Sequence, residues 1–163
     1  MIATIRWLAA LGAYLLASSM VTGKLFGLLF TALWNKELDY LADDIRVALT
    51  TSTFVPNQDT DDYFDDVTNE VVGAGYTATG ELLGSKTVTY TAGTNVFKLD
   101  AADTEWAASS ITARIAVVYD ATPATDATRP LIGFQDFITD RTSDNGLFKI
   151  EWDAAGIVEI TVS

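Results

Sequence analysis

The stretch NQDTDDYFDDVTNE, which begins at Asn57, gathers more potentially reactive side chains than any other segment of the chain. Five aspartates fall within eight positions. Asn57, Asp59 and Asp61 have the spacing of the first, third and fifth positions of a calcium-binding loop, and Ca²⁺ prefers oxygen ligands. The rest of that pattern fails, because Asp62 stands where the loop needs glycine and Thr68 stands where it needs glutamate. We therefore expect no metal site, and Asn57, Asp59 and Asp61 stay weak candidates for a different calcium geometry.

A catalytic role for these carboxylates disagrees with their spacing. A glycosidase needs two acids on opposed walls of a cleft, whereas these acids follow one another on a single segment. We expect instead a solvated loop that leads into one short helical turn and exposes its acids. Tyr63, Phe64 and Val67 would hold that turn against the rest of the domain.

The chain as a whole offers few groups for catalysis. Among its 163 residues there is no cysteine and no histidine. This composition removes disulfides, thiolate metal sites, thiol catalysis and every Ser-His or Cys-His arrangement. We therefore predict no enzymatic activity and no cofactor.

The net charge of −12 is distributed unevenly along the chain. Residues 1–36 carry Arg6, Lys24 and Lys36 and no acid, so the following residues hold all 22 acids against seven bases. An acidic surface of this kind repels nucleic acid, and we expect no direct binding of DNA or RNA.

Residues 1–40 are predicted to form an apolar helical arm. Trp7 to Gly23 is a run of 17 residues without a charge, and Leu25 to Asn35 is a second uncharged run. Leu, Ala and Met favour helix, and a helix that is apolar on nearly every face must be buried all round. We expect two helices separated near Gly23.

Three interpretations of this arm compete. Arg6 followed by an apolar stretch loosely fits a secretory signal peptide, although ASSMVTG is a poor cleavage region. The first uncharged run is close to the shortest length that spans a bilayer, which is compatible with a membrane anchor. We favour an arm buried against copies of itself or a neighbouring protein, because its apolar residues stop at NKELD, as in a helix that docks on a domain. The predicted contact residues are Trp7, Leu8, Leu11, Ala13, Leu15, Leu16, Leu25, Phe26, Leu29, Phe30 and Trp34.

Residues 41–163 are predicted to form one mainly β domain. Short segments that alternate apolar and polar residues recur about every ten residues, and no helix-length segment separates them. The gaps AGT and DAAG have the composition of hairpin loops. The pattern indicates an antiparallel β-sandwich, of jelly-roll or immunoglobulin-like type. The expected strands are 45–50, 86–91, 95–100, 111–120, 130–139, 147–153 and 156–162.

The expected strand at 111–120 has the longest regular alternation. Arg114 lies on its polar face, where it either pairs with an acid such as Asp136 or, as we favour, faces solvent. Trp106 and Trp152 are expected to fill the core of the domain. The apolar face of the strand is predicted to carry Ile111, Ala113, Ile115, Val117 and Tyr119.

The order of three segments resembles a family of small virion proteins of tailed bacteriophages. These segments are TNEVVGAGYTATG, ITARIAVVYD and WDAAGI, within a resemblance that runs from Gly23 to Val162. The resemblance implies a structural role without enzymatic activity, as a capsid decoration or head-fibre protein or as a minor tail component. Members of the family begin near GKLFG, so Met1–Thr22 is an extension relative to them.

We therefore expect a non-enzymatic virion structural protein that decorates or cements the capsid, or forms a head fibre, and that attaches through its N-terminal arm. The expected partners are the major capsid protein, other virion proteins and further copies of the chain. Three alternatives remain: a tail or baseplate component, an adhesin-like module that binds glycans, and a membrane-anchored surface protein.

Overall fold

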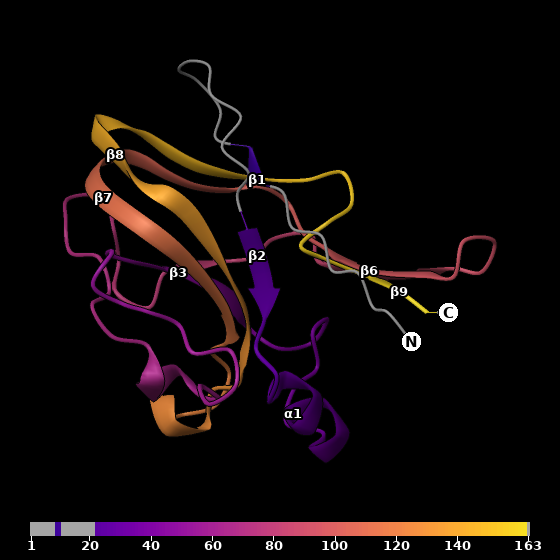
Figure 1. Cartoon of the computed structure of the whole chain (residues 1–163). Helices are drawn as coiled ribbons and strands as arrows, with labels where there is room; N and C mark the ends of the chain where they lie inside the picture. The colour runs from indigo at the N-terminus through magenta and orange to yellow at the C-terminus, as the bar shows by residue number, and fades with distance from the viewer. Residues whose placement is uncertain (1–8, 11–21, 163) are drawn as a thin grey trace.

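A computed structural model describes residues 9–10 and 22–162 of the chain (Figure 1). The described chain is mainly β, and its strands pair antiparallel in one six-stranded and one three-stranded sheet. The prediction of a mainly antiparallel β fold is therefore confirmed.

The larger sheet is built around a long pair of strands, β7 and β8. Its strand order is β1-β8-β7-β3-β4, and β2 also pairs with β8. These strands are β1 (Ala9–Ala10), β2 (Thr22–Leu25), β3 (Ile45–Thr50), β4 (Glu81–Leu82), β7 (Thr104–Asp120) and β8 (Leu131–Trp152). The segments 130–139 and 147–153, expected as two strands, thus belong to one continuous strand of 22 residues.

The smaller sheet has the order β5-β6-β9 and projects from the body of the molecule (Figure 1). Its strands are β5 (Thr87–Thr91), β6 (Val96–Asp100) and β9 (Val158–Thr161). The hairpin predicted at AGT joins β5 to β6, as expected. The hairpin predicted at DAAG is wrong, because β9 pairs with β6 and not with β8.

In the described residues, the chain between the strands forms three short helices. They are α1 (Leu29–Asn35) and two 3-10 helices, η1 (Phe64–Asp66) and η2 (Asp126–Thr128). Within the described residues, no helix is both long enough and apolar enough to cross a bilayer.

Register shifts between β7 and β8 determine which side chains lie on each face of the larger sheet, where two separate hydrophobic cores form. The register between the two strands shifts at four places, one of them between Ala113 and Ile115. A bulge adds a residue to one strand, bends it and reverses the side chains that follow. Ile111 and Ala113 accordingly point into one core, whereas Val117 and Tyr119 point into another on the opposite side of the sheet. The prediction that all of these residues share one face is therefore wrong.

Both faces of the larger sheet are covered. The inner core lies on one face and includes Trp106, Phe137 and Phe148 of the larger sheet, together with Val158 of the smaller sheet. The outer core lies on the other face, where the chain between β3 and β4 supplies Phe54 and Phe64. The complete outer core comprises Phe26, Ala48, Phe54, Phe64, Ile115, Val117, Tyr119, Leu131 and Phe134.

The N-terminal region differs from the predicted pair of helices. Gly23 does not separate helices, because it lies within β2 opposite Gln135 of β8. The backbone of Ala9–Ala10 forms β1, opposite Trp152 and Glu151. Helix α1 begins only at Leu29. The contacts of residues 22–35 with the larger sheet join them to the β domain and not to a separate arm.

Candidate interaction groove

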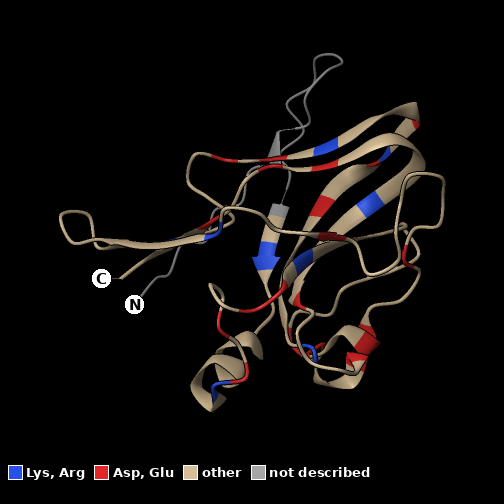
Figure 2. Ribbon diagram, turned by 180° about the vertical axis from the view of Figure 1, so that it is seen from behind, with Lys and Arg blue, Asp and Glu red and all other residues tan. Residues whose placement is uncertain are grey.

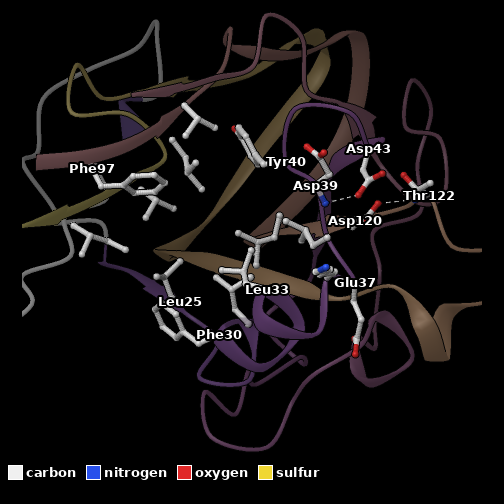
Figure 3. Close-up of a pocket in the computed structure, with 18 of the residues that line it drawn as sticks. Leu25, Phe30, Leu33, Glu37, Asp39, Tyr40, Asp43, Phe97, Asp120 and Thr122 are labelled. Carbon is white, nitrogen blue, oxygen red and sulfur yellow. Dashed lines mark hydrogen bonds between the residues drawn. The ribbon is translucent and has the colours of Figure 1, made fainter. Parts of the chain in front are cut away.

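A groove of about 750 Å³ opens between helix α1, the loop that follows it and the smaller sheet (Figure 3). Leu25 of β2, Leu29 of α1 and Ile132 of β8 line its base and are almost fully buried. These residues belong to the inner core, so the groove is a place where that core is incompletely covered.

The smaller sheet supplies the opposite wall of the groove with its apolar face. Cross-strand pairing sets Val88 opposite Leu99, Tyr90 opposite Phe97, and Phe97 opposite Ile160, which gathers apolar side chains on one face. Lys98 lies between Phe97 and Leu99 along β6 and therefore points to the other face. Val88, Phe97, Leu99 and Ile160 line the groove.

Helix α1 carries apolar side chains that are exposed in the described part of the chain. Phe30 and Leu33, which line the groove, are 44% and 42% exposed, and Trp34 beside them is 86% exposed. The helix ends at Asn35, and the left-handed backbone of Lys36 (φ 62°) lets the N–H of Glu37 donate to the carbonyl of Ala32 at 3.0 Å. This sharp end turns the chain into the loop that forms the acidic side of the groove.

Carboxylates occupy one end of the groove (Figure 3). Asp120 is 1% exposed, and its Oδ1 accepts a hydrogen bond of 2.8 Å from the N–H of Thr122. Its Oδ2 is buried and accepts no hydrogen bond from any described residue. Burial raises the pKa of Asp120, and the neighbouring Asp43 raises it further. Asp43 is held in place by the N–H of Asp39, which donates to its Oδ2 at 2.6 Å.

A lysine and a tyrosine lie next to these carboxylates. The ammonium of Lys86 donates to the backbone carbonyl of Asp43 and lies 5.9 Å from the centre of the Tyr40 ring. The hydroxyl of Tyr40 donates to the carbonyl of Asp100 at 3.2 Å, and burial followed by the charge of Asp100 raises the pKa of Tyr40. The groove thus combines apolar walls that gain from being covered with carboxylates that attract positive charge.

No family model, curated protein or solved structure matches this chain. The resemblance to phage virion proteins therefore stays a prediction from the sequence.

The predicted calcium candidates lie in a turn held by hydrogen bonds to the backbone. The N–H of Asn57 donates to Oδ2 of Asp61 at 2.8 Å, and the N–H of Asp59 donates to Oδ1 of Asn57 at 3.1 Å. Such contacts stabilise turns without a cation. Across the described part of the chain, no three acids are grouped closely enough to hold a metal ion.

The helical turn predicted after these acids is confirmed as η1. Phe64 is buried in the outer core, and Val67 packs against that core. Tyr63 is half-buried and donates its hydroxyl to Oε2 of Glu37 at 3.0 Å. Asp65 and Asp66 remain exposed, as expected.

The predicted contact residues of the arm divide into three groups. Leu25, Phe26 and Leu29 are buried in the chain's own cores, so their assignment to contacts with other proteins is corrected. Phe30 and Trp34 are exposed and available for contact. The remaining predicted contacts lie outside the described residues; they are Trp7, Leu8, Leu11, Ala13, Leu15 and Leu16.

Three further predictions concern single side chains of the larger sheet. Trp106 is buried in the inner core as expected, whereas Trp152 only packs against that core and donates its indole N–H to the carbonyl of Ala102. Arg114 pairs with Asp136 at 2.5 Å, so the pairing that we favoured less is present, on a partly exposed surface. Burial alone would raise the pKa of Asp136, but the hydrogen bond from Arg114 lowers it below its ordinary value.

Sequence reasoning missed the groove itself. Leu33, Phe97 and Ile160 belong to segments that are far apart in the chain, and no motif links them. Two signals were available: the apolar stripe of Phe30, Leu33 and Trp34, spaced as on one helix face, and the uncharged run from Thr87 to Phe97.

Proposed function

We propose that this protein is a non-enzymatic structural subunit of a bacteriophage particle, attached to the outside of the capsid as a decoration, cement or head-fibre protein. The observation that carries the proposal is the uncovered apolar surface formed by Phe30, Leu33 and Trp34 beside the groove. Large apolar patches rimmed by polar residues are typical of surfaces that bind another protein. The order of segments that resembles phage virion proteins supports the same role.

The shape of the groove favours a protein partner. Apolar side chains gain about 25 cal/mol for each Å² of apolar surface removed from water, and aromatic residues such as Phe30 and Trp34 are typical anchors of interfaces. A segment of the major capsid protein that inserts apolar side chains between α1 and the smaller sheet would cover this surface. The carboxylates of Asp43 and Asp120 would favour a segment that carries a lysine or arginine beside its apolar residues.

The charge of the chain is consistent with a position outside the capsid. A net charge of −12 repels the phosphates of packaged DNA, but a protein on the outer surface of a capsid does not meet that DNA. We interpret the mainly antiparallel β domain as a β-sandwich, which would supply a rigid module for display.

The test is to find the chain in purified particles. Reconstruction of the intact particle is expected to place the chain on the capsid lattice, and quantitative mass spectrometry is expected to give a fixed copy number per particle. Density at the tail or baseplate would favour the alternative of a tail component. Absence of the chain from gradient-purified particles would contradict the proposal.

A matched pair of variants links attachment to the groove. Replacing Trp34 with serine removes the largest exposed apolar side chain beside the groove and should reduce incorporation at least about tenfold, which corresponds to 1.4 kcal/mol of binding energy. Val72, at 96% exposed and away from the groove, provides the control, and Val72→Ser should incorporate normally. Equal incorporation of the two variants would show that α1 does not attach the protein.

A further inference from the structure

Strand β5 is an open edge of the smaller sheet. Its five residues, Thr-Val-Thr-Tyr-Thr from Thr87 to Thr91, are all exposed. One side of β5 pairs with β6, and no described strand pairs with its other side. Alternate backbone N–H and C=O groups along that side therefore point away from the sheet and are free to pair with another strand.

The edge of β5 lacks the devices that usually prevent pairing between molecules. Charged side chains, proline and bulges protect most natural edges. The other described edge strands of four residues each contain a charge, Lys24 in β2 and Glu159 in β9, and β4 is short and contains Glu81. By contrast, β5 contains neither charge nor proline, and its register with β6 runs without a shift from Thr87 to Thr91.

We propose that β5 pairs with β5 of a second copy of this chain, antiparallel and about a two-fold axis that passes beside Thr89. The pairing extends the smaller sheet across two molecules, with three strands from each. This inference concerns how the chain associates with itself, and it does not depend on the function proposed above.

The sequence of β5 fits itself in this register. An antiparallel pair centred on Thr89 sets Thr89 opposite Thr89 of the second copy, Thr87 opposite Thr91, and Val88 opposite Tyr90. Pairs of threonines and pairs of an aromatic with a β-branched residue are among the favourable cross-strand combinations. A centre at Thr89 also pairs all five residues of the strand, whereas any other centre leaves some of them unpaired.

The charges of the chain also permit contact at this edge. The outer part of the β5–β6 hairpin is without charge from Thr87 to Phe97, in a chain whose net charge is −12 (Figure 2). Contact at this hairpin therefore avoids the repulsion between acids that would oppose self-association elsewhere. The base nearest to the axis is Lys98, which lies opposite Thr89 on β6 and pairs with Asp100. In the dimer it would lie three inter-strand spacings, roughly 14 Å, from Lys98 of the second copy, which is beyond the range of strong repulsion in physiological salt.

Pairing at β5 would complete the apolar surface of the groove. Tyr90 is 56% exposed and lies opposite Phe97 on the face that forms the groove wall. In the proposed dimer, Tyr90 lies against Val88 of the second copy, so each molecule covers apolar surface that the other leaves open. The two groove walls would then form one continuous apolar face with a groove in each molecule.

The absence of cysteine from the chain allows a clean test of this register. In the full-length protein, Thr89→Cys should form a disulfide-linked dimer under mild oxidation with oxidised glutathione, because the Cβ atoms of directly opposed residues lie about 5 Å apart. Thr87→Cys is the matched control. It should not link to itself, because the two copies of residue 87 would be roughly 14 Å apart. A mixture of Thr87→Cys and Thr91→Cys should link.

Charge variants test the same contact without covalent chemistry. Sedimentation of the full-length protein should show a dimer, and Thr89→Lys and Thr89→Glu should each raise the dissociation constant at least about tenfold by opposing like charges at the axis. An equimolar mixture of the two variants should recover the dimer. Thr161→Lys, on the opposite edge of the same sheet, should leave the dimer unchanged. Circular dichroism and thermal melting would confirm that each variant is folded.

Two results would overturn the inference. One is a wild-type protein that stays monomeric at about 100 µM, a concentration at which even weak dimers become populated. The other is a dimer that neither Thr89→Lys nor Thr89→Glu weakens, or in which Thr87→Cys links to itself as readily as Thr89→Cys.

Discussion

The ring of Phe64 stacks on the ring of Tyr119, with 3.9 Å between the ring centres and 15° between the ring planes. Phe64 lies in the acidic segment that could have been a metal site, and Tyr119 lies near the end of β7. The hydroxyl of Tyr119 donates to the carbonyl of Thr79 at 2.8 Å, which fixes the ring against which Phe64 packs. The acidic segment is thus attached to the larger sheet by its aromatic residue, while its acids face water.

Phe64→Ala should lower the free energy of unfolding by about 3 kcal/mol, because truncating a buried phenylalanine leaves a cavity and removes the stacking contact. Asp65→Asn is the control within the same turn, and it should change stability by less than about 0.5 kcal/mol because Asp65 is exposed. Urea unfolding followed by circular dichroism measures both. Similar losses for the two variants would mean that the charge of the turn matters more than its packing.

Removal of divalent cations should leave the protein unchanged. Backbone N–H groups already occupy oxygens of Asn57 and Asp61, so the turn does not need a cation to hold its shape. EDTA is expected to shift the melting temperature by less than about 2 °C, well below the shift that the loss of a structural ion produces. A fall of many degrees that Ca²⁺ restores, and Mg²⁺ does not, would identify a calcium site at Asn57–Asp61.

Two phenylalanines of the N-terminal region test whether that region is part of the β domain. Phe26 is fully buried, and its ring centre lies 5.1 Å from that of Phe134 on β8, whereas Phe30 is 44% exposed on α1. Phe26→Ala should lower the free energy of unfolding by about 3 to 5 kcal/mol. Phe30→Ala should change it by less than about 0.5 kcal/mol. Equal and small effects in chemical denaturation would restore the interpretation of residues 22–35 as a separate arm.

The sequence predicted the strands well where one pattern persisted. The bounds predicted for β3 agree with the structure, and those for β5, β6 and β9 differ by one or two residues, because turn residues flank short alternating runs. The alternation along β7 misled the assignment of faces, since a bulge near Arg114 leaves no mark in an otherwise regular pattern. Distinguishing the two cores therefore required the pairing of β7 with β8, which the sequence does not specify.

The helix predicted from Leu25 onward begins only at Leu29 in the structure, for a different reason. Helix propensity favoured helix through Leu25 and Phe26, but pairing with the exposed edge of β8 and burial in the two cores outweigh a preference of a few tenths of a kcal/mol per residue. The groove could not be predicted either, because it depends on the separation between α1 and a sheet assembled from distant segments. The sequence excluded histidine and cysteine chemistry for the whole chain, but it did not indicate that these apolar residues and acids come together.

The buried carboxyl of Asp120 should make stability depend on pH. Its pKa is raised by burial and then by Asp43, so the folded state binds a proton at this site more tightly than the unfolded chain does. The contribution of Asp120 to stability is therefore fully present below the ordinary aspartate pKa of about 4, and it is lost as pH rises through the raised pKa of the folded state. At neutral pH the charged form is the disfavoured one, with its Oδ2 buried and no described group donating to it.

Asp120→Asn should consequently stabilise the protein at neutral pH, by about 1 kcal/mol, because its amide stays uncharged, its Oδ1 can still accept from the N–H of Thr122, and its Nδ2 can donate to Asp43. Within this range the advantage over the wild type should be smallest at pH 4, where Asp120 is protonated in the folded state and still about half protonated in the unfolded chain, and it should grow as pH rises before reaching a plateau. Urea unfolding of both proteins at unit steps from pH 4 to pH 8 measures this difference. The exposed Asp144 serves as the control, and Asp144→Asn should follow the wild type at every pH. A difference between Asp120→Asn and the wild type that stays constant over this range would show that folding does not shift the pKa of Asp120, and a difference that shrinks as pH rises would show that the surroundings stabilise the carboxylate. Either result would contradict the prediction.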